Sequence, residues 1–389
     1  MVPLRLIFAH ARAQPLRWSL TGGSVALAIF LFCTLETVVT SLQLLVSGTS
    51  GNRLIASSAV SLFQSLPLSG IERIRAARIP GVRNIGHWTW FDGVYVDPKE
   101  FFPRFAVDVP MLRAQYGDRS PRGAEYQLDP AVWDRFTDER ASCIVGRGLA
   151  DRYGFAVGDS LVIEGTIYPG TWRFTIAGIY TSTNPTYDEE TMFFHWNYLN
   201  EELGRFDLVG TFSIDLEDDA DGAQVCAAVD DLFRNSSNRT LTQSEAAFQA
   251  QFLSMWGNVG LLFSFIGGAV IFATAVIALN TMLLSVRERV KEVGVLQTLG
   301  FTRASVRNLY LAEAIVLCLG GALAGILLAK LAWHGQPIRL ATVIFPTFGV
   351  SNTTVLHAVL IGTGLALIAG IAPAIAASRW TIVRSLREG

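Results

Sequence analysis

Four long apolar blocks constrain the fold of this 389-residue chain more than any other feature of its sequence. Each block holds about 20 or more mainly apolar residues, enough for an α-helix to cross a hydrocarbon core of about 30 Å. About 200 residues of mixed composition separate the first block from the second. The sequence therefore predicts one membrane span, a folded domain outside the membrane, and three further spans.

Composition agrees with a membrane protein. Only 16% of the residues are charged and 51% are hydrophobic, whereas soluble domains usually carry about 25% charged residues. These figures disfavour an ordinary soluble enzyme. The formal net charge of −2 gives no basic footprint, so we expect no nucleic-acid partner.

The expected segments follow from the positions of the apolar blocks. They are a cytoplasmic N-terminal amphipathic segment (1–19), a first span (20–46), an outer domain (47–252), a second span (253–286), a charged loop (287–305), a third span (306–334), a short outer loop (335–353), a fourth span (354–377) and a cytoplasmic tail (378–389).

Arginine and lysine set the expected orientation, because they are enriched in the cytoplasmic loops of membrane proteins. They gather in the N-terminal segment, the loop after the second span and the tail: Arg5, Arg12, Arg17, Arg287, Arg289, Lys291, Arg303, Arg307, Arg379, Arg384 and Arg387. We expect these parts in the cytoplasm and the outer domain on the opposite side of the membrane. The first block exceeds the 7–15 residues typical of a signal peptide core, so we interpret it as a retained helix.

The sequence pattern of the outer domain predicts an α+β fold. Extended runs are expected near 84–96, 159–164, 172–177 and 211–216, and an amphipathic helix at 220–234. Ser69 and Thr242 each precede a glutamate by three residues, which predicts two helix caps. Residues 98–141 and 181–208 fit no clear pattern, and a bond between Cys143 and Cys226 is left open.

The chain carries no motif for catalysis. Its only lysines are Lys99, Lys291 and Lys330, and none completes a phosphate-binding loop. No His-Glu-x-x-His or Gly-x-Ser-x-Gly sequence occurs. We therefore expect no catalytic residue, no metal site and no cofactor bound by this chain.

The spans carry polar and small residues at helical spacing. Glu36, Thr40 and Gln43 lie on one stripe of the first span. They form either a polar seam facing a cavity or a second copy, or a lone carboxyl hydrated near the outer interface. Small residues of the third and fourth spans predict close helix packing, at Gly321, Gly325, Gly362 and Gly370. Glu313 is expected to reach the cytoplasmic side or to pair with Arg307.

The loop after the second span is the most informative stretch. Residues 285–299 alternate charged and apolar positions as an amphipathic helix, and Gly300 ends it. This sequence, with Leu309-Tyr-Leu-Ala-Glu313, Leu319-Gly-Gly-Ala-Leu-Ala-Gly325 and Ala372-Pro-Ala-Ile-Ala-Ala-Ser-Arg379, resembles the FtsX/MacB superfamily of ABC transporter permeases, which includes the MacB, LolC and LolE types. The order of spans and outer domain is similar to that family too.

The resemblance implies a non-catalytic permease subunit that relays ATP hydrolysis on a separate cytoplasmic ATPase to its outer domain, for export or lipid and lipoprotein handling. It implies ATP and Mg on that ATPase, and a second permease chain (identical or paralogous) and membrane lipid as partners. It also implies that the spans lie in the bacterial inner membrane, with both termini in the cytoplasm and the outer domain in the periplasm. A periplasmic adaptor, an outer-membrane factor and the substrate stay open. The residues expected to contact the ATPase are Arg287, Glu288, Arg289, Lys291, Glu292, Val293, Gly294, Leu296, Leu299 and Gly300. The alternatives are an FtsX-like activator of a cell-wall hydrolase and a membrane receptor or scaffold without an ATPase.

Overall fold

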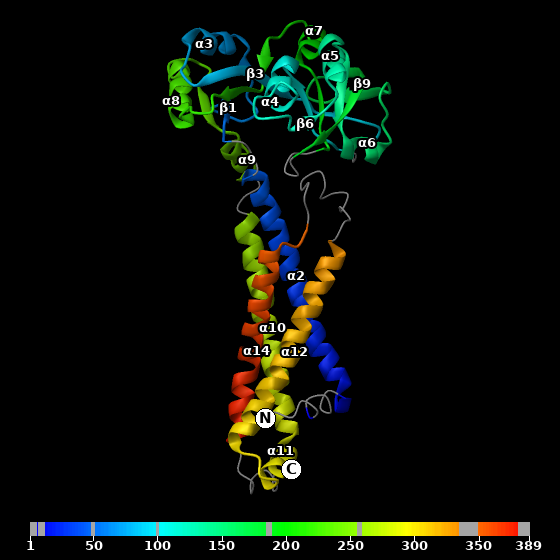
Figure 1. Ribbon diagram of the computed structural model, residues 1–389, viewed down its shortest axis with the longest axis vertical. Coiled ribbons are helices and arrows are strands. Elements are labelled where there is room, and N and C mark those ends of the chain that lie inside the picture. The colour runs from blue at the N-terminus through cyan, green and yellow to red at the C-terminus, as the bar shows by residue number, and fades with distance from the viewer. Residues whose placement is uncertain are drawn as a thin grey trace. The chain divides into compact units, whose positions relative to one another are not determined.

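The computed structural model describes residue 6 and residues 12–47, 51–98, 101–183, 189–254, 259–333 and 349–379. The chain divides into two compact units (Figure 1). The helical unit comprises residues 1–41, 258–337 and 348–389, and the α/β unit comprises residues 42–257 and 338–347. Arg5, Arg384 and Arg387, which the sequence places in the cytoplasm, lie outside the described residues.

Long apolar helices build the helical unit. Among the described residues, four segments are long and apolar enough to span a membrane: Pro15–Ser41, Gly260–Glu288, Arg303–Ala332 and Asn352–Ser378. They belong to helices α2 (Pro15–Ser47), α10 (Val259–Glu288), α12 (Arg303–Ala332) and α14 (Asn352–Ser378). At about 1.5 Å per residue, each exceeds the thickness of a hydrocarbon core. The arrangement of one span, an intervening domain and three spans is confirmed.

Glycines allow these helices to approach closely. Gly321 and Gly325 of α12 lie against α2, and Gly362 and Gly370 of α14 lie against α12. A Cβ added at Gly325 would lie 2.4 Å from a backbone carbonyl oxygen of α2. A larger residue at these positions would force the helices apart, because helices in lipid associate through such flat surfaces.

A mixed sheet forms the centre of the α/β unit. In the described residues it has eleven strands in the order β13-β1-β12-β3-β5-β10-β7-β9-β8-β4, with β6 paired to β9. The strands are β1 (Arg53–Ser58), β3 (Val82–Trp90), β4 (Gly93–Val94), β5 (Arg104–Val107), β6 (Tyr126–Gln127), β7 (Ser142–Gly146), β8 (Ser160–Gly165), β9 (Gly170–Ser182), β10 (Met192–His195), β12 (Thr211–Leu216) and β13 (Thr240–Ser244). The short strands β2 (Leu66–Pro67) and β11 (Leu208–Val209) pair with each other.

Helices pack on this sheet through apolar side chains. They are α3 (Ser69–Ala77), α4 (Val109–Tyr116), α5 (Pro130–Asp138), α6 (Arg147–Tyr153), α7 (Trp196–Glu202) and α8 (Gly222–Phe233). Helix α9 (Glu245–Ser254) follows β13 and begins with the buried Glu245. Every residue of β7 and β10 is buried, so both faces of the sheet are covered there. The unassigned stretch 98–141 folds as β5, α4, β6 and α5.

Two local predictions are wrong. Ser69 does not cap α3, because Leu68 is the N-cap residue and the helix begins at Ser69 itself. Thr242 lies inside β13, where its hydroxyl donates to Asp230 Oδ1 at 2.7 Å. Ser244 accepts a hydrogen bond from the amide of Ala247 in its place.

The cysteines of the α/β unit are unbonded. Cys143 is buried in β7, Cys226 is half-buried in α8, and both are free thiols. Burial raises the pKa of the Cys226 thiol, which favours its neutral form. These thiols serve as small apolar core residues.

Candidate functional site

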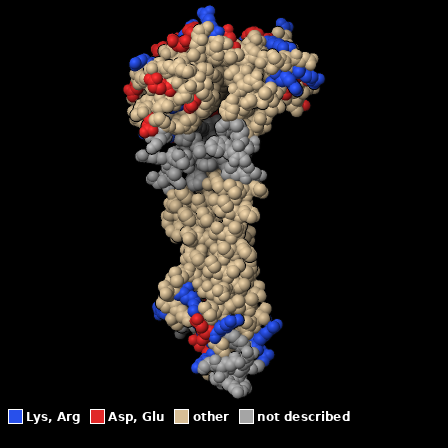
Figure 2. All heavy atoms as spheres, turned by 180° about the vertical axis from the view of Figure 1, so that it is seen from behind, with Lys and Arg blue, Asp and Glu red and all other residues tan. Residues whose placement is uncertain are grey.

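A short helix joins the second and third spans at one end of the helical unit. α10 ends at Glu288, α11 runs from Val290 to Thr298, and α12 begins at Arg303. Gly300 has φ +93°, a conformation that favours glycine, and it makes the turn after α11. Figure 2 shows acidic and basic side chains gathered at this end of the helical unit.

One face of α11 is anchored to the spans. Val293 has no exposed surface and packs with Val286 of α10 and Tyr310 of α12. Ala374 and Ala377 of α14 complete this small core. Gly294 is buried as well. The buried face of α11 therefore packs against residues of three spans.

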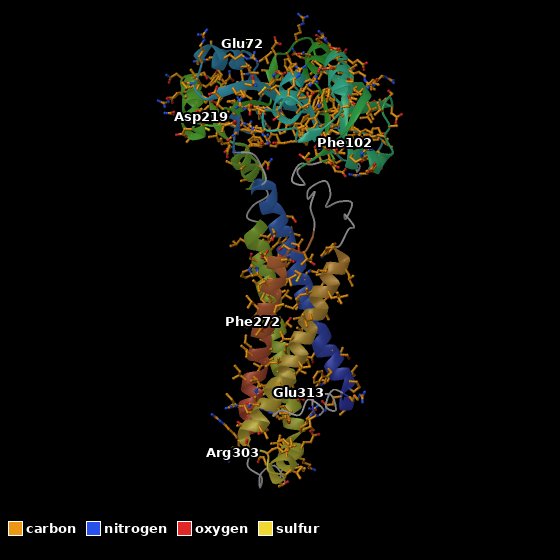
Figure 3. All side chains as sticks on the ribbon, in the orientation of Figure 1. Glu72, Phe102, Asp219, Phe272, Arg303 and Glu313 are labelled. Atoms are coloured by element: carbon orange, nitrogen blue, oxygen red, sulfur yellow. The ribbon has the colours of Figure 1, made fainter. Side chains whose placement is uncertain are left out.

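A buried ion pair adds to this anchor. Arg289, between α10 and α11, places Nη1 3.1 Å from Oε1 of Glu313 in α12, and the two side chains are 4% and 2% exposed. Figure 3 labels Glu313 on its helix. Removing one such partner leaves a buried charge without compensation, so the pair holds both groups in a fixed geometry.

The expectation that Glu313 pairs with Arg307 is wrong. Six positions at about 100° each place the two side chains on different faces of one helix. Arg307 is exposed, and its Nε donates to Asn308 Oδ1 at 3.4 Å. Glu313 lies on the buried face, where Arg289 is the cation within reach.

The beginning of the first span is tied to the same place. Arg17 of α2 lies 2.7 Å from Glu288 at the end of α10. The side-chain oxygen of Gln14 accepts from Arg17 at 3.0 Å and from Arg289 at 3.4 Å. These polar contacts join α2, α10 and α12 next to α11.

The other face of α11 is open. The residues predicted to contact an ATPase divide into two groups: Arg287, Glu288, Lys291, Glu292, Leu299 and Gly300 are exposed and Leu296 is half-buried, whereas Arg289, Val293 and Gly294 are buried. The exposed face also carries Val295, which is 50% exposed. The sequence prediction did not include Val295, although its helical spacing from Lys291 and Leu299 indicates the same face.

The polar stripe of the first span meets the fourth span. Glu36 Oε1 lies 3.3 Å from Nδ1 of His357 in α14, and the side chains are 30% and 53% exposed. Thr40 is half-buried, and the side chain of Gln43 lies outside the described residues. His357 was not singled out from sequence, because a partner on another helix leaves no local pattern.

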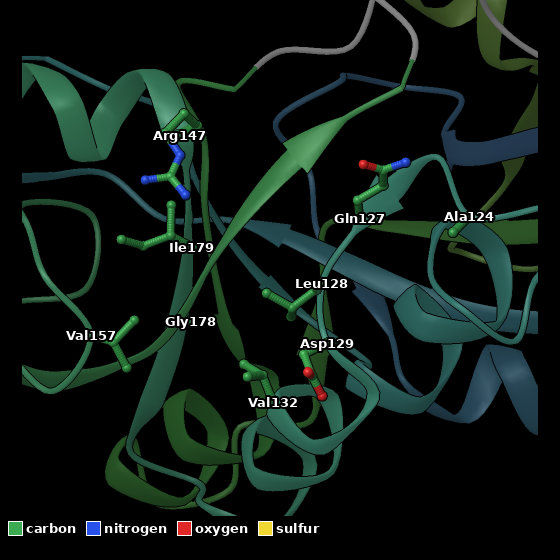
Figure 4. Close-up of a pocket in the computed structure, with 9 residues that line it drawn as sticks. All are labelled: Ala124, Gln127, Leu128, Asp129, Val132, Arg147, Val157, Gly178 and Ile179. Carbon is green, nitrogen blue, oxygen red and sulfur yellow. The ribbon is translucent and has the colours of Figure 1, made fainter.

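A pocket in the α/β unit contains none of the predicted site residues. It has a volume of about 610 Å³. Figure 4 shows Arg147 and Ile179 on one side of it and Leu128 and Asp129 on the other. Among the described residues, no group of three or more His, Cys, Asp or Glu side chains is placed to hold a metal ion.

Comparisons with known families cover most of the chain. Residues 19–232 match the MacB-like periplasmic core domain, and residues 246–382 match the FtsX-like permease C-terminal family. The first match extends over more than half of the chain.

Individual relatives match shorter parts. The macrolide export ATP-binding/permease protein MacB of Agrobacterium fabrum is 29% identical over 166 residues, which are 41% of this chain and 26% of that protein. The ABC transporter permease YvrN of Bacillus subtilis is 38% identical over 110 residues, 28% of this chain and 26% of that protein. The chain thus matches about a quarter of the length of these relatives.

Among solved structures, the periplasmic region of MacB from Actinobacillus actinomycetemcomitans superposes with a TM-score of 0.38 at 9% identity. The superposition covers 53% of this chain and 94% of that one.

Proposed function

Because the chain belongs to the MacB/FtsX-type ABC transporter permeases, we propose that it couples a separate cytoplasmic ATPase to movement of its α/β unit. The single observation that carries this proposal is the division of α11 into two faces. One face is exposed and charged, and the other is locked to the spans by Val293 and the Arg289–Glu313 pair.

The exposed face suits a protein partner. Arg287, Lys291 and Glu292 offer charges of both signs beside Val295 and Leu299, which are 50% and 71% exposed. Mixed charges around apolar side chains are typical of an interface with a complementary partner. An ATPase seated there would push or pull a helix that cannot move alone.

The remaining parts of the proposal follow from the family. ATP and Mg are held by the ATPase, and this chain contributes no catalytic residue. A second permease chain, identical or paralogous, completes the membrane part. The spans lie in the bacterial inner membrane with both termini in the cytoplasm, and the α/β unit lies in the periplasm.

The movement serves export or the handling of lipids and lipoproteins at the cell envelope. Such a role needs no continuous polar path through the spans, because the work is done by the α/β unit. A periplasmic adaptor and an outer-membrane factor are further partners that this role accommodates. The name of the Agrobacterium relative refers to macrolide export, and macrolides are one substrate class to examine.

Charge reversal on the exposed face tests the proposal. We expect Arg287→Glu/Lys291→Glu to abolish co-purification of the ATPase, since two positive charges become negative on the surface that the ATPase is proposed to contact. The matched control is Arg135→Glu/Arg147→Glu, two exposed arginines of the α/β unit, which should leave co-purification unchanged. Retention of the ATPase by the first variant contradicts the coupling assignment.

A further inference from the structure

The chain enters and leaves the α/β unit through paired strands. β1 follows α2, which ends at Ser47, and β13 leads into α9, which precedes α10. β1 and β13 are antiparallel, with Leu54 opposite Ser244 and Ser58 opposite Thr240. The segments that continue into the first and second spans therefore leave the sheet side by side.

A buried arginine joins these two segments. Arg53, the first residue of β1, has no exposed surface. Its Nε lies 2.8 Å from Oε2 of Glu245, the first residue of α9, and its Nη1 lies 2.9 Å from Oε1 of Glu125. The guanidinium also lies over the ring of Tyr116, 4.3 Å from the centroid. The Tyr116 hydroxyl donates to Glu245 Oε1 at 3.1 Å.

The same contacts reach the far part of the sheet. The amide of Glu125 donates to the carbonyl of Tyr116 at 2.9 Å, and the amide of Thr183 donates to the carbonyl of Glu125 at 2.9 Å. Thr183 directly follows β9. Arg53 thus connects the incoming strand, the outgoing helix and the segment that pairs with β9.

Such a cluster fixes geometry rather than merely filling space. Charge-assisted hydrogen bonds have preferred distances and directions, and the planar guanidinium has several donors in a rigid arrangement. An apolar contact of equal size tolerates sliding and rotation. The contacts of Arg53 therefore hold β1 and α9 in one orientation relative to each other.

We propose that Arg53 is a positioning residue that locks β1 to α9, so that the first strand and the last helix of the α/β unit move together when the ATPase works. This inference rests on the proposed function, since it concerns how movement is passed to the α/β unit. Arg53 has no role in binding the ATPase.

Amide hydrogen exchange of the α/β unit tests the inference in the full chain, reconstituted in nanodiscs with its ATPase. Exchange is compared without nucleotide and with ATP plus vanadate. We expect a nucleotide-dependent change in the unsubstituted chain, its loss in Arg53→Met and a smaller change in Arg53→Lys, which keeps the charge but not the planar set of donors. The matched control is Arg104→Met, because Arg104 is equally buried and lies over the Phe102 ring at 3.9 Å. We expect Arg104→Met to keep the change.

Two further observations keep the test decisive. If Arg53→Met does not fold, Arg53→Met/Glu245→Leu replaces it, because an apolar pair of similar volume often restores stability. The double variant should likewise show no nucleotide-dependent change in hydrogen exchange. A retained change in folded Arg53→Met or Arg53→Met/Glu245→Leu overturns the inference, and so does loss of the change in Arg104→Met. Absence of any change in the unsubstituted chain overturns the proposed function and the inference together.

Discussion

Replacing Glu313 by leucine leaves the Arg289 guanidinium buried without its carboxylate, since Arg289 is only 4% exposed. Breaking a buried ion pair from one side destabilises a protein by about 3–5 kcal/mol. That range corresponds to roughly two to four orders of magnitude in the unfolding equilibrium. We expect Glu313→Leu to lower the free energy of unfolding by about 3–5 kcal/mol.

A double variant distinguishes the effect of a buried unpaired charge from the effect of changed side-chain volume. In Arg289→Met/Glu313→Leu, two apolar side chains replace the pair and no charge stays buried, so stability should return to near that of the unsubstituted chain. Arg17→Ala serves as a control, because the Arg17–Glu288 pair is 25% and 41% exposed. Solvent screens an exposed pair of this kind, so Arg17→Ala should leave the free energy of unfolding nearly unchanged.

Stability is measured by reversible denaturation in micelles, and ATPase binding by co-purification. Glu313→Leu keeps the exposed face of α11, so the folded fraction should still bind the ATPase. The reasoning is refuted if Glu313→Leu lowers the free energy of unfolding by less than about 1 kcal/mol, which is what the loss of an exposed ion pair would cost. It is also refuted if the double variant is as unstable as the single one.

Three other predictions concern other parts of the chain. Burial and the nearby Arg75 lower the pKa of His87 to about 4, so the folded state favours neutral imidazole. The neutral His87 stabilises the folded state fully above its unfolded pKa of about 6.5, and this stabilisation is lost as the pH falls toward 4. The free energy of unfolding of the α/β unit should therefore fall by about 2 kcal/mol between pH 7 and pH 5. Thermal melts of the full chain should show a smaller pH dependence in His87→Phe, and an unchanged dependence refutes this assignment. Glu36→Leu should insert normally but alter pairing of two permease chains, measured by cross-linking in membranes; unchanged pairing favours a lone hydrated carboxyl. Gly325→Leu should lower the melting temperature of the helical unit, because its Cβ meets the α2 backbone at 2.4 Å and overpacking destabilises by about 1–3 kcal/mol; an unaltered melting temperature contradicts that packing.

The helical unit could be predicted from the sequence because each span is marked by its own run of apolar residues. Twenty apolar residues in succession identify a span without knowledge of its neighbours. The alternation of charged and apolar residues likewise identified α11. The same pattern did not reveal that Arg289 turns inward, since its partner Glu313 is 24 positions away on another helix.

The fold of the α/β unit was harder to predict from the sequence, because its sheet pairs strands that lie far apart in the chain. Individual runs such as residues 211–216 were predicted as strands, and β12 forms there. The strand order depends on contacts between segments far apart in the chain, which no local pattern records. Arg53 and Glu245 are separated by 192 positions, and neither residue is distinctive by itself.

The most direct test of the central claim follows the α/β unit while the ATPase works. Amide hydrogen exchange is measured on the reconstituted complex with and without ATP plus vanadate, in the unsubstituted chain and in Arg287→Glu/Lys291→Glu. Coupling through α11 predicts a nucleotide-dependent change in the α/β unit of the unsubstituted chain and none in the variant. Unaltered exchange in the unsubstituted chain, with the ATPase bound and trapped by vanadate, contradicts the account.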